Sequence, residues 1–177
     1  MVCNTIHLFY DELQRETKTP ILDLRKAVKK EIIRRKIKRV LILGTPLTIR
    51  KGLYHDNHYT CIEPSESELK ELSKRICAHN RGAKKEEHCA MIHKLCEKYI
   101  GQGAEVIIAG CTEFALMLAG SKLPVIDAID VLIDTTIKKF FTSRPAISNF
   151  KLAQQSAGHY TQFEIKRMEE NSNGMGN

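Results

Sequence analysis

The amino-acid sequence predicts an α/β fold with a mostly parallel sheet flanked by helices. Short apolar runs of strand length alternate with longer stretches of helical periodicity, and the clearest runs cover residues 40–43 and 106–109. A block that begins with a cysteine also occurs twice, once near the start of the chain and once near residue 111. This duplication predicts two pseudo-symmetric lobes.

Length and composition favour a folded, soluble protein. The chain has 177 residues, of which 42% are hydrophobic and 28% are charged, enough for one core or two small lobes. Its longest apolar runs fall far short of the ~20 residues that a bilayer-spanning helix needs. Asp11, Glu12 and Glu16 lie where a secretory signal would be apolar. Six cysteines are too few for a disulfide scaffold, so we expect reduced thiols and a cytoplasmic protein with no membrane contact.

The first part of the chain predicts helices alternating with short strands. Asn4 or Thr5 can cap a first helix that runs to about Glu16. The elements expected after it are a short strand over 19–23, a basic helix, a buried strand over 39–44 that ends in a Gly-Thr-Pro turn, and a strand over 59–63.

The net charge of +7 is concentrated in the basic segment 25–39. This segment holds nine Lys or Arg residues against one acid, Glu31, and carries +8, so the rest of the chain carries −1. Val28, Ile32 and Ile33 recur within it at helical spacing, which predicts an amphipathic helix with a solvated basic face. A nucleic-acid surface is the less favoured interpretation because no aromatic residues are interleaved for base stacking, and we expect no nucleic-acid partner.

The second part of the chain begins with a capping box, in which Ser65 and Glu68 open a helix ahead of Leu69, Leu72 and Ile76. The elements expected after it are a helix over 83–100, a strand over 105–110, a helix over 112–119, a strand over 123–127 and a helix over 130–141. From about residue 143 the sequence is polar, and we expect a partly disordered extension with a short helix over 163–168.

The duplicated block places a thiol at the start of each copy. The first copy reads Cys-Asn-Thr at 3–5 and returns through Pro-Ile-Leu-Asp at 20–23. The second reads Cys-Thr-Glu at 111–113 and returns through Pro-Val-Ile-Asp at 124–127. Each copy therefore predicts a cysteine at a junction of strand and helix, followed by a strand that ends in Asp.

The junction gives these thiols a chemical interpretation. A thiol at a helix N-terminus meets the positive end of the helix dipole, which favours the thiolate, and the nearby N–H groups can hold a carboxylate. Two alike thiols across one cleft could remove a proton from one face of a carbon and return a proton to the other face. The alternative is that both are small buried hydrophobes, but two matching copies beside Thr favour function.

On these motifs the sequence resembles the aspartate/glutamate racemase family, the PLP-independent two-cysteine amino-acid racemases. The resemblance runs from Met1 to about Phe141. It rests on Cys-Asn-Thr-Ile-His at 3–7, Leu-Gly-Thr at 43–45 with Thr48, Gly-Cys-Thr-Glu at 110–113, and Pro-Val-Ile-Asp at 124–127. It implies racemisation of aspartate or glutamate without a cofactor, on a small-molecule amino-acid substrate, by a possible homodimer.

The resemblance also implies roles for individual residues. Cys3 and Cys111 would be the acid/base pair. The α-carboxylate would be bound by Asn4 and Thr5, with help from Thr112, while Thr45 and Thr48 would line the same cleft. Glu113 would orient Cys111. His7 lies four residues after Cys3, and we leave open whether it tunes the thiol or the substrate charge, or is a helix residue near a cap.

The family pattern begins well before its first cysteine, so the resemblance implies that the first lobe is N-terminally incomplete. We expect a remnant of the first lobe over 1–38, the second lobe over 39–127, a helix returning to the first lobe over 128–142, and a polar tail over 143–177. Two alternatives to the acidic amino-acid racemase remain. One is a catalytically inactive, truncated fragment or interaction module, and the other is a related hydantoin racemase or maleate cis-trans isomerase.

Two clusters of residue types that can bind metals have simpler interpretations. Cys89, His93 and Cys96 fall on one helix face, but they continue its apolar stripe, which favours core packing over zinc binding. A looser cluster lies in a predicted loop and strand start and comprises His55, His58 and Cys61. We expect no metal site.

Overall fold

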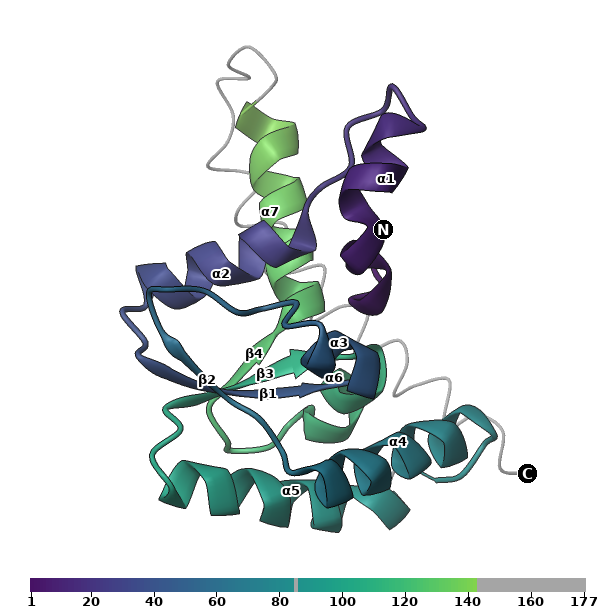
Figure 1. Cartoon of the computed structure of the whole chain (residues 1–177), viewed down its shortest axis with the longest axis vertical. Coiled ribbons are helices and arrows are strands. Elements are labelled where there is room, and N and C mark those ends of the chain that lie inside the picture. Colours follow the sequence, from purple (N-terminus) through teal and green to yellow (C-terminus); the bar gives the residue numbers. More distant parts are fainter. Residues whose placement is uncertain (85, 143–177) are drawn as a thin grey trace, which may run out of the picture. The chain divides into compact units, whose positions relative to one another are not determined.

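The computed structural model describes residues 1–84 and 86–142. Residues 1–138 form one compact unit, and a second unit begins at Lys139. Four parallel strands make the sheet, in the order β2-β1-β3-β4 (Figure 1). They are β1 (Arg39–Gly44), β2 (Thr60–Ile62), β3 (Val106–Gly110) and β4 (Val125–Asp127). The expected α/β class with a parallel sheet is confirmed, whereas the expected tail and its short helix lie outside the described residues.

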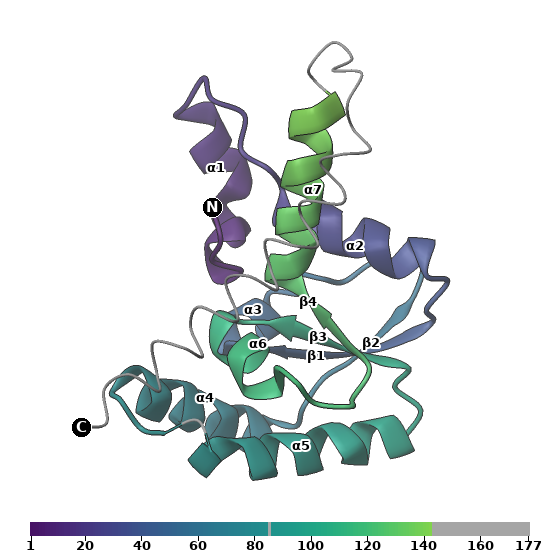
Figure 2. The ribbon, with the colours of Figure 1, turned by 180° about the vertical axis from the view of Figure 1, so that it is seen from behind.

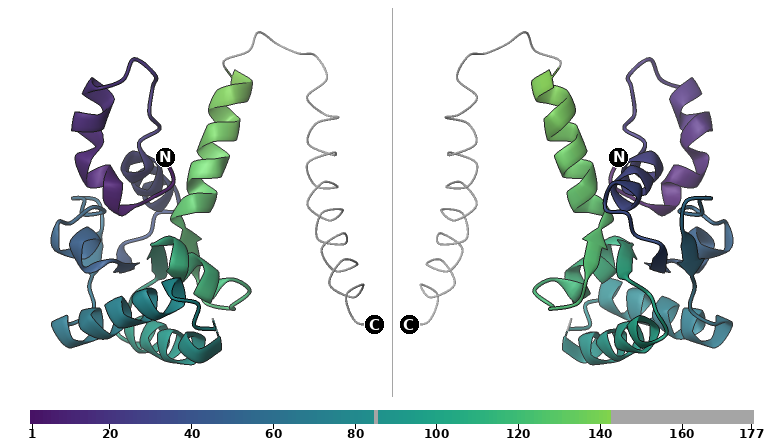
Figure 3. Two further views of the ribbon diagram at one scale, coloured as in Figure 1. Left: turned by 90° about the vertical axis from the view of Figure 1, so that its right-hand side faces the viewer. Right: turned by 90° about the vertical axis from the view of Figure 1, so that its left-hand side faces the viewer.

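Helices lie on both faces of this sheet. Helix α2 (Leu24–Arg34) covers one face, and α4 (Glu66–Asn80) and α5 (Glu86–Gly101) cover the other, as Figures 1 and 2 show from opposite sides. The side views of Figure 3 show the same layers. The remaining helices are η1 (Thr5–Phe9), α1 (Tyr10–Arg15), α3 (Pro46–Arg50), α6 (Thr112–Leu118) and α7 (Ala128–Thr142). None of the described helices is long and apolar enough to span a bilayer.

The central positions of β1 and β3 in the sheet explain why their sequences are apolar. Every residue of β3 is buried, as is every residue of β1 after Arg39. A parallel strand that is covered by helices on both faces buries successive side chains on either side, so it needs an unbroken apolar run rather than alternation. The runs predicted from sequence at 40–43 and 106–109 are these two strands.

Helix α2 carries the basic segment on its outer side. Leu24, Val28 and Ile32 are fully buried. Ile33, which the sequence analysis placed with them, is 41% exposed, because one helix face accommodates residues spaced by four and not their immediate neighbour. Glu31 pairs with both Arg34 and Arg35 on the solvated side. Residues 25–34 of the segment are thus part of an amphipathic helix, and the segment ends at Arg39, the first residue of β1.

The capping box that opens α4 is present. The Ser65 hydroxyl accepts from the backbone N–H of Glu68, and the Glu68 carboxylate accepts from the backbone N–H of Ser65. Behind this cap, Leu69, Leu72 and Ile76 are buried. Local sequence was sufficient here because both partners of the box lie within one turn.

The expected strand over residues 19–23 is wrong. A segment becomes a strand only when a neighbouring strand pairs with its backbone, and this segment has no such neighbour in the described chain. Its polar groups are used locally instead. The N–H of Ile21 donates to Gln14 Oε1 at 2.8 Å, and the Asp23 carboxylate caps α2 by accepting from the N–H of Lys26. The segments that end the two copies, 20–23 and 124–127, are therefore alike in sequence but differ in structure.

The Gly-Thr-Pro turn after β1 opens a short helix that the sequence analysis did not predict. Thr45 is the N-cap of α3, where its hydroxyl accepts from the N–H of Thr48, and Pro46 stands in the first turn. Proline is common at this position because it has no N–H to leave unpaired. Helix α3 carries the chain away from the end of β1.

Candidate active site

The predicted site residues gather at the carboxyl ends of β1 and β3. The strand order reverses here, since β2 lies beyond β1 on one side and β4 lies beyond β3 on the other. In open α/β sheets, ligands bind in the crevice outside such a reversal point. Gly44 and Gly110 end the two strands as register partners, and Thr45 and Cys111 follow them directly.

Cys111 is the N-cap residue of α6 and is 8% exposed. Its Sγ donates to Glu113 Oε2 at 2.6 Å. Burial raises the pKa of Cys111 to about 12, with further contributions from the hydrogen bond to Glu113 and its charge, and from the charge of Cys3. The prediction that the helix N-terminus favours a thiolate therefore fails at this cysteine, because burial and a neighbouring carboxylate outweigh the dipole of a short helix.

Glu113 is placed to hold that thiol. Its Oε2 also accepts from the Thr112 hydroxyl at 2.9 Å, and its carboxylate has a further hydrogen bond from the Asn80 side chain at the end of α4. Burial alone would raise the pKa of Glu113, but these donors together hold the pKa below its ordinary value. Glu113 is therefore a carboxylate that is hydrogen-bonded to the Cys111 thiol.

Cys3 lies just before η1, and its residue is exposed. Its charge contributes to the raised pKa of Cys111, so the two sulfur atoms are within electrostatic reach of each other. His7 is fully buried, with Nδ1 2.8 Å from the Cys3 carbonyl oxygen and Nε2 3.3 Å from the Leu22 carbonyl oxygen. The His7 ring thus fixes the backbone of Cys3 rather than contacting its sulfur.

Three threonines join the first cysteine block to the end of β1. The hydroxyl of Thr5 lies 3.0 Å from that of Thr45 and 2.9 Å from that of Thr48, and the last two are 3.0 Å apart. Each hydroxyl has one proton to donate, so three mutual hydrogen bonds use all three protons in a closed ring. The structure brings together the three threonines that the sequence placed in one cleft.

Asn4 is the other polar residue of the first block that is buried here. It is 2% exposed, and its Oδ1 accepts from the hydroxyl of Tyr54. Among the described residues, no acceptor partners its Nδ2. A buried donor without a partner is rare in folded proteins, and a bound carboxylate would satisfy it.

A comparison with known families accounts for this arrangement. A family model described as "Asp/Glu/Hydantoin racemase" matches residues 1–136. The chain belongs to this racemase family.

Two curated proteins are similar to this chain over most of its length. The "broad specificity amino-acid racemase RacX" of Bacillus subtilis (strain 168) is 26% identical over 144 residues, which cover 78% of this chain and 62% of that protein. An "uncharacterized protein in pnlA 3'region" of Pectobacterium carotovorum subsp. carotovorum is 24% identical, and the match covers 76% of this chain and 94% of that protein. This racemase-family chain therefore spans less than two thirds of the Bacillus protein.

Solved structures show the same fold. An aspartate racemase homologue from Pyrococcus horikoshii OT3 superimposes with a TM-score of 0.66 at 29% identity, covering 77% of this chain and 63% of that one. The "Picrophilus torridus aspartate racemase" gives a TM-score of 0.67 at 22% identity, covering 78% of this chain and 60% of that one. The second likeness concerns the fold alone.

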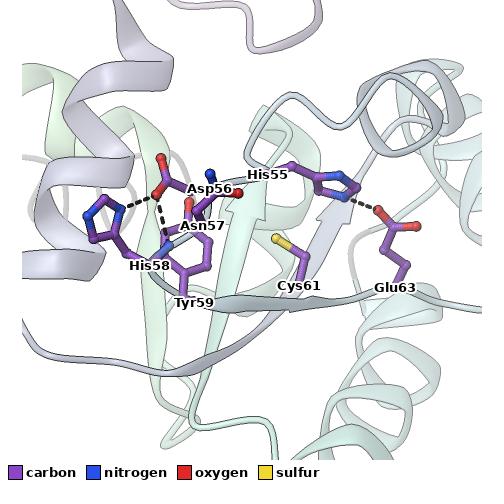
Figure 4. A pocket seen from close by; sticks show the side chains of 7 residues that line it. All are labelled: His55, Asp56, Asn57, His58, Tyr59, Cys61 and Glu63. Carbon is purple, nitrogen blue, oxygen red and sulfur yellow. Dashed lines mark hydrogen bonds and ion pairs between the residues drawn. The ribbon is translucent and has the colours of Figure 1, made fainter.

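The candidate site is separate from a polar pocket of about 650 Å³ around β2 (Figure 4). Two histidine–carboxylate pairs line that pocket, His55 with Glu63 at 2.7 Å and His58 with Asp56 at 2.5 Å. None of the residues predicted for racemisation lines it. Within the described ranges, no group of His, Cys, Asp or Glu side chains is arranged to hold a metal ion. The other cysteine cluster contributes to the core, where Cys96 is fully buried.

Two residues beside the candidate site have no signal in the sequence. Tyr54 contacts Asn4 across 50 positions of sequence, and Asn80 contacts Glu113 from the end of α4. Neither residue stands in the duplicated block, and no motif spacing marks either one. Only the folded chain brings them to the ends of β1 and β3.

Proposed function

We propose that this racemase-family chain racemises an acidic amino acid, aspartate or glutamate, in the cytoplasm by a two-thiol acid/base mechanism without a cofactor. The observation that carries the proposal is the buried Cys111 thiol, held by Glu113 and within electrostatic reach of Cys3. A two-base racemase needs two such residues, one to exchange a proton with each face of the substrate carbon.

In one direction, the Cys3 thiolate removes the α-proton of the substrate, and the electron pair of the C–H bond passes into the carbanion that forms. Cys111 then donates its S–H proton to the opposite face, and the electron pair forms the new C–H bond. The products are the other enantiomer, a Cys3 thiol and a Cys111 thiolate, so protons and electrons balance. Cys111 is the acid in this direction because its raised pKa keeps it protonated at neutral pH. The opposite enantiomer uses the reverse roles.

Substrate binding is assigned to the donors around the two thiols. The unpartnered Nδ2 of Asn4 is the donor for the α-carboxylate, and the backbone N–H groups at the start of α6 add partial positive charge nearby. Thr5, Thr112 and the ring that Thr5 forms with Thr45 and Thr48 complete the wall of the site. Binding of the carboxylate stabilises the charge that develops on it as the α-proton leaves.

Deuterium exchange tests the reaction directly. We expect folded protein in deuterated water to exchange the Cα hydrogen of L-aspartate or L-glutamate and to abolish the optical rotation of the sample. Cys3→Ala and Cys111→Ala should each abolish racemisation, while Cys77→Ala, at an exposed cysteine of α4, should leave it intact. Exchange that persists in both site variants would contradict the two-thiol mechanism.

The substrate assay needs a panel. The Bacillus relative is named as a broad-specificity racemase and the Pyrococcus relative as an aspartate racemase homologue. We therefore propose aspartate and glutamate first, with neutral amino acids, a 5-substituted hydantoin and maleate as comparisons. Turnover of only the hydantoin or of maleate would assign the site to one of the two related activities.

The second candidate is an inactive interaction module that keeps the racemase frame. It is favoured by exposed apolar side chains on the first turns, where Val2, Ile6 and Phe9 are 59%, 41% and 50% exposed. Such side chains suit a protein interface, including that of a homodimer. A folded sample without exchange on any substrate would support this candidate, and light scattering would report whether the chain forms a dimer.

A further inference from the structure

Tyr54 is a buried residue that the proposed reaction does not yet use. It lies in the loop that follows α3 and is 1% exposed. Its hydroxyl donates to Asn4 Oδ1, and its own carbonyl oxygen accepts from the Tyr59 hydroxyl at 2.5 Å. Tyr54 is thus held at its backbone and at the tip of its side chain.

At the end of β3, Gly110 leaves room for the Tyr54 ring because it has no side chain. A Cβ atom at Gly110 would lie 3.0 Å from Tyr54 Cε2 and 2.9 Å from the Leu43 carbonyl oxygen, both closer than side-chain carbons normally approach. The residue before Cys111 therefore needs to be glycine for the ring to reach Asn4. The ring therefore packs in the part of the core that adjoins Cys111.

The contact with Tyr54 decides which way the Asn4 amide faces. An amide has an acceptor oxygen on one side and a two-proton donor on the other, and the hydrogen-bond network assigns the two. The Tyr54 hydroxyl donates to Asn4 Oδ1, and burial, the largest cause, raises the pKa of Tyr54, so this hydroxyl is neutral. The amide oxygen is therefore directed at Tyr54, which leaves Nδ2 as the buried donor without a partner in the described part of the chain.

We propose that Tyr54 is a positioning residue for carboxylate recognition, which fixes the Asn4 amide so that Nδ2 faces the substrate carboxylate. This inference rests on the proposed racemisation and deepens it. Without the Tyr54 hydroxyl, the amide can turn over and direct its oxygen at the carboxylate, which replaces a hydrogen bond with repulsion between two acceptors. Tyr54 acts through Asn4 and does not touch the reacting carbon.

A double-mutant cycle on Asn4 and Tyr54 tests this coupling. Tyr54→Phe keeps the ring beside Gly110 and removes only the hydroxyl. We expect it to raise the KM for L-aspartate roughly tenfold, with kcat changed about threefold or less, because it removes one buried hydrogen bond. In an Asn4→Ala background the same change should cost little more, since Tyr54 then has no amide to orient. Tyr99→Phe is the matched control, because Tyr99 is also buried, at 6% exposed, but donates to Glu68 away from the site.

Two outcomes would overturn the inference. One is a Tyr54→Phe variant with the KM and kcat of wild type while wild type is active, which leaves the proposed racemisation standing. The other is a full additive loss in the double variant, which assigns Tyr54 a role independent of Asn4. Thermal melts of each variant separate these results from unfolding.

A binding measurement keeps the inference testable if wild type shows no turnover. In ¹⁵N spectra, the side-chain amide of Asn4 is assigned by its loss in Asn4→Ala. We expect L-aspartate to shift this signal in wild type and to shift it at least severalfold less in Tyr54→Phe. A shift without turnover would uphold the role of Tyr54 and reject racemisation, and no shift in either protein would reject both.

Discussion

Removing the charge of Glu113 should change the reactivity of Cys111. The pKa of Cys111 rises from the ordinary value of 9.0 to about 12, which corresponds to about 4 kcal/mol against the thiolate. Burial is the largest cause, and the hydrogen bond and charge of Glu113 follow it. Glu113→Gln keeps an acceptor for the thiol and removes the negative charge, so we expect the pKa of Cys111 to fall by roughly one.

A fall of that size makes thiolate about ten times more abundant at pH 8, since pH 8 lies below both values. Iodoacetamide reacts with the thiolate, so alkylation of Cys111 should accelerate about tenfold in Glu113→Gln. Peptide mass spectrometry reports the rate for each cysteine, and the exposed Cys77 serves as an internal reference. Glu66→Gln, at an exposed glutamate paired with Arg50, is the matched control.

The direction of the change is decisive. A rate at Cys111 that is unchanged in Glu113→Gln would mean that burial alone keeps the thiol protonated. A slower rate would mean that Glu113 removes the proton and promotes the thiolate. Either result would refute the assignment of Glu113 as the group that holds Cys111 in its acid form.

The remaining predictions concern stability. Burial raises the pKa of Cys96 from 9.0 to about 12, so the protonated thiol contributes fully to the free energy of unfolding below pH 9, and this contribution is lost as the pH rises toward 12. Between pH 9 and 10, urea unfolding should show a fall of up to about 1.4 kcal/mol in the free energy of unfolding, and Cys96→Ala should lack this fall. Asp23→Ala removes the cap of α2 and should cost about 1 kcal/mol at pH 7. Because the pKa of Asp23 is lowered, despite burial, by hydrogen bonds from Arg25 and the backbone, that cost should shrink as the pH falls through the lowered value. Thr48→Val opens the threonine ring at a residue that is 1% exposed and should cost roughly 1–3 kcal/mol in urea unfolding, whereas Thr60→Val at an exposed position should not.

Features that depend on neighbours in sequence were predictable. The buried strands β1 and β3 follow from unbroken apolar runs, and the start of α4 follows from Ser65 and Glu68 within one turn. The second copy of the duplicated block begins directly after β3, where Cys111 follows Gly110. Each of these signals is contained in a stretch of a few residues, so no knowledge of the fold was needed to read it.

Features that depend on contacts across the chain were not predictable. Residues 19–23 were predicted as a strand, but strand formation requires a paired neighbour that the described chain does not provide. The Cys111 thiol read as a thiolate from its place at a helix start, but its protonation is set by burial and by Glu113. Tyr54 carried no signal because its partner Asn4 lies 50 residues away.

The two cysteines are alike in sequence and unlike in surroundings, and this asymmetry has a kinetic consequence for the proposed reaction. Cys111 is buried beside a carboxylate, whereas Cys3 is exposed. After one turnover Cys111 would be a thiolate next to Glu113, the form that its surroundings disfavour most. Return of a proton to Cys111 is therefore favourable and need not wait for the opposite enantiomer. The resting site should therefore favour the state in which Cys111 is the acid, and the opposite enantiomer, which needs Cys111 as its base, would depend on the less populated state with the roles reversed.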